Sequence, residues 1–198
     1  MVKTIIFDIG GVIVDLDYKQ VCAPLVELSG WDTASVREQV ENGPIVIAAM
    51  KGLIEPREFH RLLCLELGIS IGYDLFVKIW VRLLSDNKGI EQTIRELKSK
   101  FNLVLASNTD HIHFNFCVNN FSILSCFETR FISYDMGLLK PDPEYFHQVL
   151  RGLDQPLDEI LFIDDRQENV ESAKSVGITA LRFSSNENLK TELSAILP

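Results

Sequence analysis

The stretch TIIFDIGGVIVDLD, Thr4 to Asp17, decides the fold because it joins a short apolar run to one acid and a glycine pair. The run from Ile5 to Phe7 predicts a buried strand, and the pair Gly10-Gly11 lets the backbone turn sharply and approach a ligand closely. Asp8 then lies where the strand ends, at the edge of a doubly wound sheet where ligands bind. Asp8 is therefore either a catalytic residue or an acid that forms a turn or caps a helix.

Apolar runs of strand length recur along the second half of the chain. With the first run they are TIIFD (4–8), NLVLASN (102–108), TRFISY (129–134), EILFIDD (159–165) and ITALRF (178–183). Segments with helical periodicity separate them, and in one of these Ile90, Ile94 and Leu97 share a helical face. Asp142 and Pro143 form the N-cap and first position of another helix. This alternation predicts an α/β fold, a Rossmann-like and mostly parallel sheet with right-handed crossovers and helices on both faces.

Residues 16–86 contain no convincing strand after the first one and carry several apolar helical faces, such as the one that includes Phe76 and Trp80. We expect an inserted all-helical cap in this range and an α/β core made of residues 1–15 and 87–198. A block inserted directly after the first strand begins and ends near the ligand crevice, so it can close over the site as a lid. The alternative is a bundle that only adds stability.

Charge and the length of the apolar runs limit the partners that we expect. The formal net charge is −9, so nucleic acid and an anionic membrane surface would be repelled. The first apolar run is interrupted by Asp8, and no later run reaches the roughly 18 residues needed to span a bilayer. We therefore expect a cytoplasmic protein, a monomer or homodimer, without a signal peptide or membrane anchor. Its 4 cysteines are scattered without metal-ligand spacing, which favours buried free thiols.

Polar side chains gather at four strand or loop ends. They are Asp8 in FDIGG, Ser107, Asn108 and Thr109 in LASNT, Lys140 in GLLKPD, and Asp164 and Asp165 in FIDDRQEN. Two further carboxylates beside Asp8 would repel it unless a cation lies between them, and hard oxygen ligands suit Mg²⁺. Lys140 can hold an anionic group and keep Asp8 ionised, while the Ser107 hydroxyl can donate to phosphate oxygens. This set of groups is suited to phosphoryl transfer through an aspartyl-phosphate.

The order and spacing of FDIGGVIVD, LASNT, LLKPD and FIDDRQEN resemble the four signature motifs of the haloacid dehalogenase-like (HAD) hydrolase superfamily across essentially the whole chain. The helical block resembles the C1-type cap of that superfamily, and GGV and SNT are similar to its small sugar-phosphate phosphatase branch, the glucose-1-phosphate type. The resemblance implies a Mg²⁺-dependent phosphatase that hydrolyses a small phosphorylated metabolite through an aspartyl-phosphate. It also implies that Asp8 is the nucleophile, that Ser107 and Asn108 bind the phosphate, and that Lys140 orients nucleophile and phosphate. The implied Mg²⁺ ligands are Asp8, the Gly10 carbonyl and Asp165, with Asp164 close by at the metal.

Gly10 departs from most phosphatases of the resembled superfamily, which place there a second Asp that protonates the leaving oxygen and later activates water. Losing such a general acid/base costs about 10²–10⁴ in rate. Three explanations stay open: water or another side chain substitutes, the leaving group is better than a simple alcohol, or turnover has been lost. A sugar 1-phosphate or an acyl phosphate fits the second explanation. Members of the resembled branch also carry Gly there and are regarded as phosphatases, which favours activity.

Several side chains are candidate substitutes for the missing acid/base. Asp15 and Asp17 could reach back across the glycine turn, but a solvated helix entry or a capping pair is the commoner arrangement. His111 and His113 follow the predicted phosphate loop and either act on the substrate or pack the loop.

Other interpretations of the site also remain. One is a 2-haloacid dehalogenase-type hydrolase, in which an Asp attacks carbon without a metal, although that type has neutral residues where this chain has Asp164-Asp165. A second is a catalytically impaired phospho-ligand-binding protein, which only Gly10 supports, and a third is a mutase. Substrate choice is expected in the cap, where Ile45, Ile47 and Ala48 either pack the helices or line the crevice and favour a compact, partly apolar organophosphate.

Overall fold

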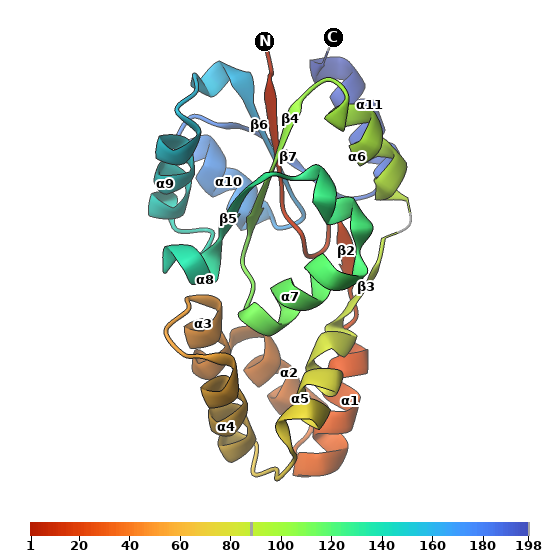
Figure 1. Cartoon of the computed structure of the whole chain (residues 1–198), viewed down its shortest axis with the longest axis vertical. Helices are drawn as coiled ribbons and strands as arrows, with labels where there is room; N and C mark the ends of the chain where they lie inside the picture. The colour runs from red at the N-terminus through yellow and green to blue at the C-terminus, as the bar shows by residue number, and fades with distance from the viewer. Residues whose placement is uncertain (88, 198) are drawn as a thin grey trace.

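Five parallel strands form the central sheet in the order β5-β4-β1-β6-β7, with the first strand in the middle (Figure 1). The computed structural model describes residues 1–87 and 89–197. The strands of the sheet are β1 (Thr4–Phe7), β4 (Asn102–Ser107), β5 (Thr129–Ile132), β6 (Ile160–Asp164) and β7 (Thr179–Arg182). All five strands that the apolar runs predict are therefore confirmed. Every pairing is parallel because helical segments connect the strands.

The helices are spread over both halves of the chain. They are α1 (Tyr18–Ser29), α2 (Thr33–Asn42), α3 (Pro44–Met50), α4 (Pro56–Glu66), α5 (Tyr73–Trp80), α6 (Ile90–Lys98), α7 (His111–Asn120), α8 (Ser133–Met136), α9 (Pro143–Leu153), α10 (Gln167–Ser175) and α11 (Asn186–Ile196), with 3₁₀ turns η1 (Val81–Leu83), η2 (Ser122–Cys126) and η3 (Leu157–Glu159). The predicted start of α9 is confirmed, because the Asp142 side chain accepts from the Glu144 N–H and Pro143 is the first helical residue.

Both faces of the sheet are buried by helices, as the alternation of strands and helices predicts. Phe7 and Leu105 belong to a core cluster that includes residues of α6, α7 and α11. Ile6 and Val104, one position earlier on the same strands, belong to a second cluster with residues of α9 and α10. Successive strand residues point to opposite faces, so an almost continuous apolar run is what a sheet covered on both sides requires.

Helices α1 to α5 form a separate block below the sheet in Figure 1, with an apolar core of their own. Phe59 of α4 packs edge-on against Phe76 and Trp80 of α5, at ring-centroid distances of 5.5 and 5.1 Å. Ile112 of α7 is the residue of the sheet region that joins this core. The block is therefore anchored to the sheet region at the start of α7.

A short antiparallel ribbon joins the helical block to the sheet region. It consists of β2 (Val14–Leu16) and β3 (Leu84–Asp86). The prediction that residues 16–86 contain no strand is wrong at these two ends, since β2 extends into the range and β3 closes it. Each strand has 3 residues, which is too short to show an alternating pattern in the sequence. Residues 88 and 198, which the predicted core range includes, lie outside the described residues.

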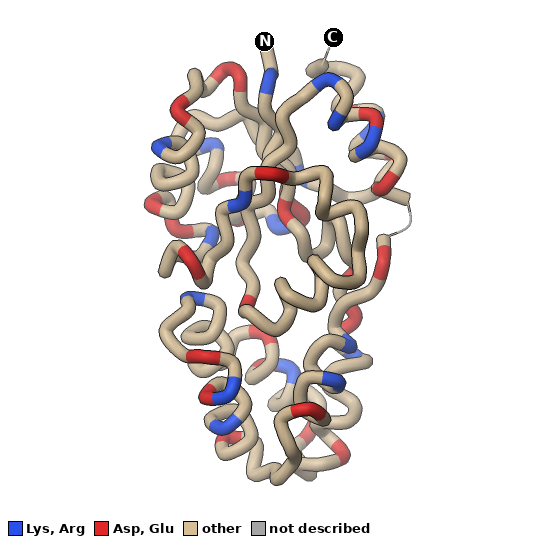
Figure 2. Tube along the Cα trace, viewed as in Figure 1, with Lys and Arg blue, Asp and Glu red and all other residues tan. Residues whose placement is uncertain are grey.

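Charged residues of both signs lie along the outer helices, and Figure 2 shows basic residues interspersed with acidic ones in both halves of the molecule. Among the described helices, none combines the length and the apolar character that crossing a membrane requires. Both termini lie at the end of the molecule opposite the helical block (Figure 1).

Candidate active site

Three neighbouring strands end in polar side chains at one edge of the sheet. Asp8 follows β1 directly, while Ser107 and Asp164 are the last residues of β4 and β6. The strands are adjacent and parallel, so their carboxyl ends meet. A cleft of about 310 Å³ opens there, and its lining includes Asp8, Ser107, Lys140 and Asp165 together with Val46 and Trp80 of the helical block. The predicted convergence of the site residues is thus observed.

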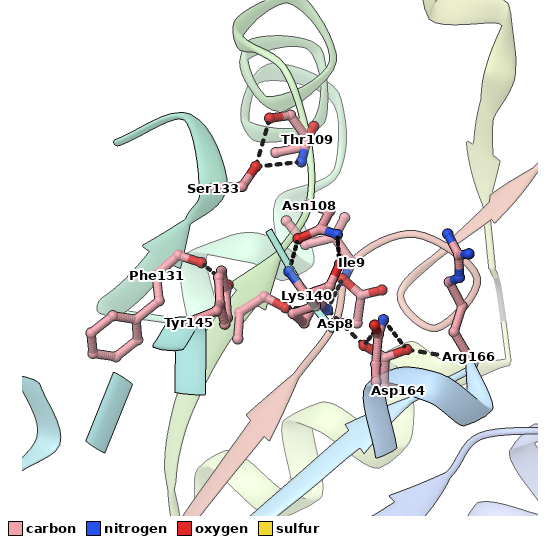
Figure 3. A network of polar contacts seen from close by, with 12 residues as sticks. Asp8, Ile9, Asn108, Thr109, Phe131, Ser133, Lys140, Tyr145, Asp164 and Arg166 are labelled. Atoms are coloured by element: carbon pink, nitrogen blue, oxygen red, sulfur yellow. Dashed lines mark hydrogen bonds and ion pairs between the residues drawn. The ribbon is translucent and has the colours of Figure 1, made fainter. Parts of the chain in front are cut away.

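The carboxylate of Asp8 is buried and held through one of its two oxygens. Oδ1 accepts the N–H of Ile9 at 2.7 Å and lies 3.1 Å from Nζ of Lys140 (Figure 3). Oδ2 accepts no hydrogen bond from the residues that the structure describes, so it is the oxygen available to a ligand. Burial raises the pKa of Asp8 to about 7, and the Lys140 ammonium opposes this rise. A cation in the cleft would favour the ionised form further.

Lys140 is completely buried and uses all of its ammonium protons. Its Nζ contacts Asp8 and also lies 2.6 Å from Oδ2 of Asp164 and 2.8 Å from the carbonyl oxygen of Ala106. The two carboxylates raise the pKa of Lys140 although burial opposes them, so the ammonium stays charged. The side chain is therefore a fixed cation that aims the nucleophile candidate, because it has three donors and three acceptors.

Asn108 clamps the backbone of Lys140 rather than pointing freely into the cleft. Its Nδ2 donates to the Lys140 carbonyl at 2.7 Å, and its Oδ1 accepts the Lys140 N–H at 2.9 Å (Figure 3). Ser107 is buried at the cleft wall, next to Asn108. The next residue, Thr109, is tied to Ser133 through its N–H at 3.0 Å. Hydrogen bonds to Lys140 and Ser133 thus hold the loop after β4, whose residues line the cleft.

The acids after β6 differ in how their oxygens are used. Asp164 is fully buried and already accepts from Lys140, from the N–H of Arg166 at 2.9 Å, and from Nδ2 of Asn169 at 3.0 Å on each oxygen. Asp165 lines the cleft, and no side-chain hydrogen bond to its carboxylate is found among the described residues. Asp165 therefore has the freer carboxylate, whereas Asp164 is committed to holding Lys140.

The carboxylates of Asp8, Asp164 and Asp165 fit a hard divalent cation. One oxygen from each lies within 4.8 Å of the others. Burial and the charge of Asp164 raise the pKa of Asp165. A cation bound between the carboxylates would offset their mutual repulsion. All-oxygen donors of this kind suit Mg²⁺. The donor set thus supports the predicted metal.

The glycine pair lets these acids approach the backbone. Gly11 has φ of +75°, and a Cβ there would overlap the Asp165 carboxylate. A Cβ on Gly10 would lie 3.3 Å from Cδ1 of Leu16, which also lines the cleft. An apolar side chain therefore borders Gly10, the position at which the resemblance led us to expect a second Asp.

The helical block supplies the far wall of the cleft. Of the apolar stretch 42–52, Val46 and Met50 line the cleft, together with Tyr18 and Glu41 from α1 and α2. Ile45 instead packs against the core of the block. Val46 and Met50 are one helical turn apart, and this spacing was the signal for the cleft-facing side of α3 that the sequence interpretation missed.

Three of the four candidate substitutes for the missing acid/base are held by other contacts. Asp17 caps α1 by accepting the N–H groups of Lys19 and Gln20, and Asp15 is exposed on the β2–β3 ribbon. His111 stacks on Tyr134 at a centroid distance of 3.8 Å.

His113 lines the cleft but is paired with Asp110 at 2.8 Å. Asp110 was not singled out from the sequence, and its partner Trp80 was named only as part of an apolar helical face. The sequence signal that could have revealed the Asp110–His113 pair is an Asp at a helix N-cap position three residues before a His.

The cysteines are free thiols, and three of the four are buried, as expected; Cys126 is half-buried. Cys117 lines the cleft, but burial and the charge of Asp110 raise the pKa of its thiol to about 12. A thiol with this pKa is not a nucleophile near neutral pH. Arg166 makes a surface ion pair with Glu168 at 2.6 Å and also lines the cleft.

Comparison with known proteins points to one enzyme family. The family model for haloacid dehalogenase-like hydrolases matches residues 2–177. The chain is 25% identical over 205 aligned residues to D-ribitol-5-phosphate phosphatase of Bacteroides thetaiotaomicron, covering 100% of this chain and 99% of that protein. It is 27% identical over 184 residues to a sesquiterpene phosphatase of Aspergillus oryzae, covering 91% and 89% of the two chains. A crystal structure of a HAD family enzyme from Bacteroides thetaiotaomicron, in complex with magnesium and inorganic phosphate, superposes with a TM-score of 0.84 at 26% identity and covers 93% of this chain and 95% of that one.

Proposed function

Because the chain belongs to the haloacid dehalogenase-like hydrolases, we propose that it is a phosphatase that removes phosphate from a small phosphorylated metabolite. The observation that carries the proposal is the geometry of Asp8, whose Oδ1 is held by Lys140 and Ile9 while Oδ2 is left for attack. Relatives named as phosphatases over nearly the whole chain support the same reaction class.

In the proposed mechanism, Oδ2 of Asp8 attacks phosphorus and the bond from phosphorus to the leaving oxygen breaks. The leaving oxygen takes the electron pair of that bond, and the phosphoryl group stays on Asp8 as an acyl phosphate. Water then attacks phosphorus, the bond from phosphorus to Oδ2 of Asp8 breaks, and its electron pair returns to the carboxylate. Over the whole cycle one proton of the water reaches the leaving oxygen through solvent, and the other stays on the released inorganic phosphate. Ser107 and the backbone N–H groups of the loop after β4 hold the phosphoryl oxygens, while Asn108 keeps Lys140 in place.

The ligands proposed for Mg²⁺ are the Asp8 carboxylate, the Gly10 carbonyl and the Asp165 carboxylate. Asp164 lies at the same cluster and acts mainly by fixing Lys140, since both of its oxygens already accept hydrogen bonds. When bound, the ion neutralises the charge of the phosphate and of the carboxylates that surround it. The magnesium complex of the related Bacteroides enzyme supports this assignment.

We propose that the substrate has a good leaving group, which would explain why the chain has Gly10 in place of a general acid/base. The cleft offers no free acid at that position, and Leu16 borders it instead. A sugar 1-phosphate or an acyl phosphate needs less protonation of the leaving oxygen than a simple alcohol does. The substrate named for the Bacteroides relative, D-ribitol 5-phosphate, has a primary alcohol as leaving group, so both kinds belong in the test.

We further propose that residues 16–86 are a cap and that residues 1–15 and 87–198 are the core that carries the chemistry. Support comes from the separate apolar core of the block and from its contribution of Val46 and Met50 to the cleft wall. The ribbon of β2 and β3 is then the connection on which the cap is mounted. A cytoplasmic location, and a monomeric or homodimeric state, stay predictions.

Phosphate release from a panel of sugar 1-phosphates, sugar and polyol 5-phosphates, acyl phosphates and an aryl phosphate tests the function, with Mg²⁺ and with a chelator. We expect Mg²⁺-dependent turnover that D8N abolishes while the thermal unfolding curve stays cooperative. Halide release from a 2-haloacid without metal would favour the dehalogenase alternative. Phosphate-ester binding without turnover in any condition would instead support a phospho-ligand-binding protein.

A further inference from the structure

A buried ion pair lies between the helical block and the loop that follows β4. Its members are Asp110, which is 3% exposed, and His113, which is 7% exposed. Asp110 is the N-cap of α7 and His113 stands in the first turn of that helix. Both contact Trp80, the last residue of α5, which is 1% exposed. The pair therefore joins two elements that lie about thirty positions apart in the sequence.

Four donor groups surround the carboxylate of Asp110. This arrangement favours the ionised carboxylate, which can accept from all of them. Oδ1 accepts the N–H groups of Ile112 at 2.8 Å and His113 at 3.0 Å. Oδ2 accepts Nε1 of Trp80 at 2.9 Å and lies 2.8 Å from Nδ1 of His113. A protonated carboxyl would have to point its own hydrogen at one of these donors. In agreement with this arrangement, the charge of His113 and the hydrogen bonds lower the pKa of Asp110 to about 2, against the effect of burial.

His113 faces an acceptor at each ring nitrogen. Its Nδ1 faces the Asp110 carboxylate, and its Nε2 lies 3.0 Å from the carbonyl oxygen of Trp80. A carbonyl oxygen and a carboxylate can only accept, so an imidazolium, with a proton on each ring nitrogen, is the form of His113 that satisfies both contacts. The Asp110 charge favours this form by raising the pKa of His113, although burial opposes it.

The position of the pair suits the dipoles of both helices. Asp110 places a negative charge at the N-terminus of α7, and the imidazolium faces the C-terminal carbonyl of α5. The indole ring of Trp80 stacks on the imidazole ring at a centroid distance of 5.0 Å and an interplanar angle of 18°. Ile112 adds an apolar contact, since it packs in the core of the helical block.

We propose that His113 is a positioning residue that clamps the end of α5 onto the loop after β4 and thereby fixes the Trp80 wall of the cleft relative to Ser107. Trp80, Asp110 and His113 all line the cleft, so the clamp sets the distance between the phosphate end and the wall that faces the rest of a ligand. The clamp itself is a statement about structure. Its effect on catalysis rests on the proposed phosphatase function.

Other titratable groups near the clamp are neutral at ordinary pH. Cys117 lies one turn further along α7, and Tyr134 of α8 is also coupled to the charge of Asp110. The pKa of each is raised to about 12, mainly by burial. Neither group competes with His113 for the charge of Asp110.

A direct test is NMR of the histidine ring nitrogens in the folded wild-type protein, which needs no substrate. The chain has 4 histidines, so assignment by single His→Gln variants is practical. We expect two protonated ring nitrogens on His113 at neutral pH. A single ring proton on His113 at neutral pH would overturn the proposal.

The second test reads the clamp through Trp80. In a W31F background Trp80 is the single tryptophan, and acrylamide quenching reports its exposure. We expect H113Q to raise the quenching constant of Trp80 severalfold, because Gln is uncharged and carries both of its N–H donors on one nitrogen, whereas the two acceptors face different ring nitrogens of His113. H147Q is the matched control and should leave quenching unchanged. Equal shielding of Trp80 in W31F and in W31F/H113Q would contradict the clamp.

Kinetics then separate a positioning role from a general loss of structure. We expect H113Q to raise KM about tenfold for substrates that reach the cleft wall, as loss of a charge-assisted hydrogen bond predicts, and to change kcat much less. Acetyl phosphate, which carries only an acetyl group beyond the phosphate, should keep its KM. Equal losses for both substrates would overturn the positioning role. If the wild type hydrolyses nothing but the NMR and quenching results are as expected, the proposed function fails and the clamp stands.

Discussion

The ammonium nitrogen of Lys140 lies 2.6 Å from Oδ2 of Asp164, and neither side chain is exposed to solvent. A buried pair of this kind adds little net stability, but removal of one partner leaves an uncompensated charge. The same ammonium contacts Asp8, so two carboxylates of the site share one cation. Lys140 is therefore expected to matter for both the fold and the nucleophile.

Replacing Lys140 by Met should lower the free energy of unfolding by about 3 kcal/mol, because two buried carboxylates lose their counter-charge. Without the ammonium the pKa of Asp8 rises further, so the carboxylate takes a proton and turnover falls at least about 100-fold. Urea unfolding and phosphate release measure the two effects.

K98M is the matched control for this lysine. Lys98 pairs with Glu128 at 3.2 Å on the surface, where a salt bridge contributes only about 0–1 kcal/mol. Equal stability losses in K140M and K98M would contradict the role given to the buried pair.

Asp165, which lines the cleft, should be a strong determinant of Mg²⁺ affinity. Its carboxylate is free of side-chain hydrogen bonds among the described residues and lies within 4.8 Å of the other two acids. D165N should weaken Mg²⁺ binding at least about tenfold in calorimetry, since it removes one charged oxygen ligand. D158N, at an exposed acid near the N-terminus, is the control. Unchanged Mg²⁺ affinity in D165N would require another ligand set.

The space beside Gly10 makes it possible to add back the missing acid. A Cβ there meets Cδ1 of Leu16 at 3.3 Å, which a small movement of this partly exposed side chain relieves. We expect G10D to raise kcat by about 10- to 100-fold for an alkyl phosphate and to leave an acyl phosphate nearly unchanged, because only the first needs a proton donor.

G10N is the control for that variant, since it has the same size and no acid. A similar gain in G10N and G10D would mean that side-chain size, and not proton transfer, limits the wild-type rate.

The core of the fold and the site follow from patterns within short windows of sequence. Five apolar runs of strand length predict five strands, and Asp8 and Ser107 converge because adjacent parallel strands end at the same edge. The β2–β3 ribbon was missed because strands of 3 residues leave no periodic signal.

Contacts between residues that are distant in the sequence were the other feature of the structure that could not be predicted. Trp80 and Asp110 are separated by 30 positions, and Trp80 and His113 by 33. Nothing local marks such a pair, because the contact depends on how α5 docks against α7. Asn108 was predicted to bind phosphate, whereas its side chain also holds the Lys140 backbone, a role that only the three-dimensional contact reveals.

Glu41 should influence which substrates bind. It lines the cleft from α2, and its Oε2 accepts Nε of Arg37 at 2.7 Å. The Arg37 guanidinium in turn lies 3.4 Å from the ring centroid of Tyr18. We expect E41Q to raise KM severalfold for polyol and sugar phosphates, whose hydroxyls a carboxylate binds more strongly than an amide does, and to spare acetyl phosphate.

Glu38 on the same helix is exposed and supplies the control E38Q. The kinetic comparison of the two variants decides the role of Glu41. An unchanged KM for every hydroxylated substrate in E41Q would show that the carboxylate does not touch them.

The Asp110–His113 pair should make stability depend on pH in a defined window. The pKa of His113 is raised above its ordinary value of 6.5, so its contribution is complete below that value and is lost as the pH rises through the folded-state pKa. The pKa of Asp110 is lowered from 3.8 to about 2, so its contribution is complete above 3.8 and is lost as the pH falls toward about 2. The pair therefore stabilises the fold fully between these two ordinary values.

We expect the difference in unfolding free energy between wild type and H113Q to be about 3 kcal/mol near pH 5 and to shrink as the pH is raised above 6.5 and through the folded-state pKa of His113, because the proton that maintains the ion pair is then progressively lost. Urea unfolding at a series of pH values measures this difference. H147Q, which changes an exposed histidine, should give a small difference at every pH. A difference between wild type and H113Q that stays constant across this range would mean that His113 is neutral in the fold, and that its two contacts are ordinary hydrogen bonds.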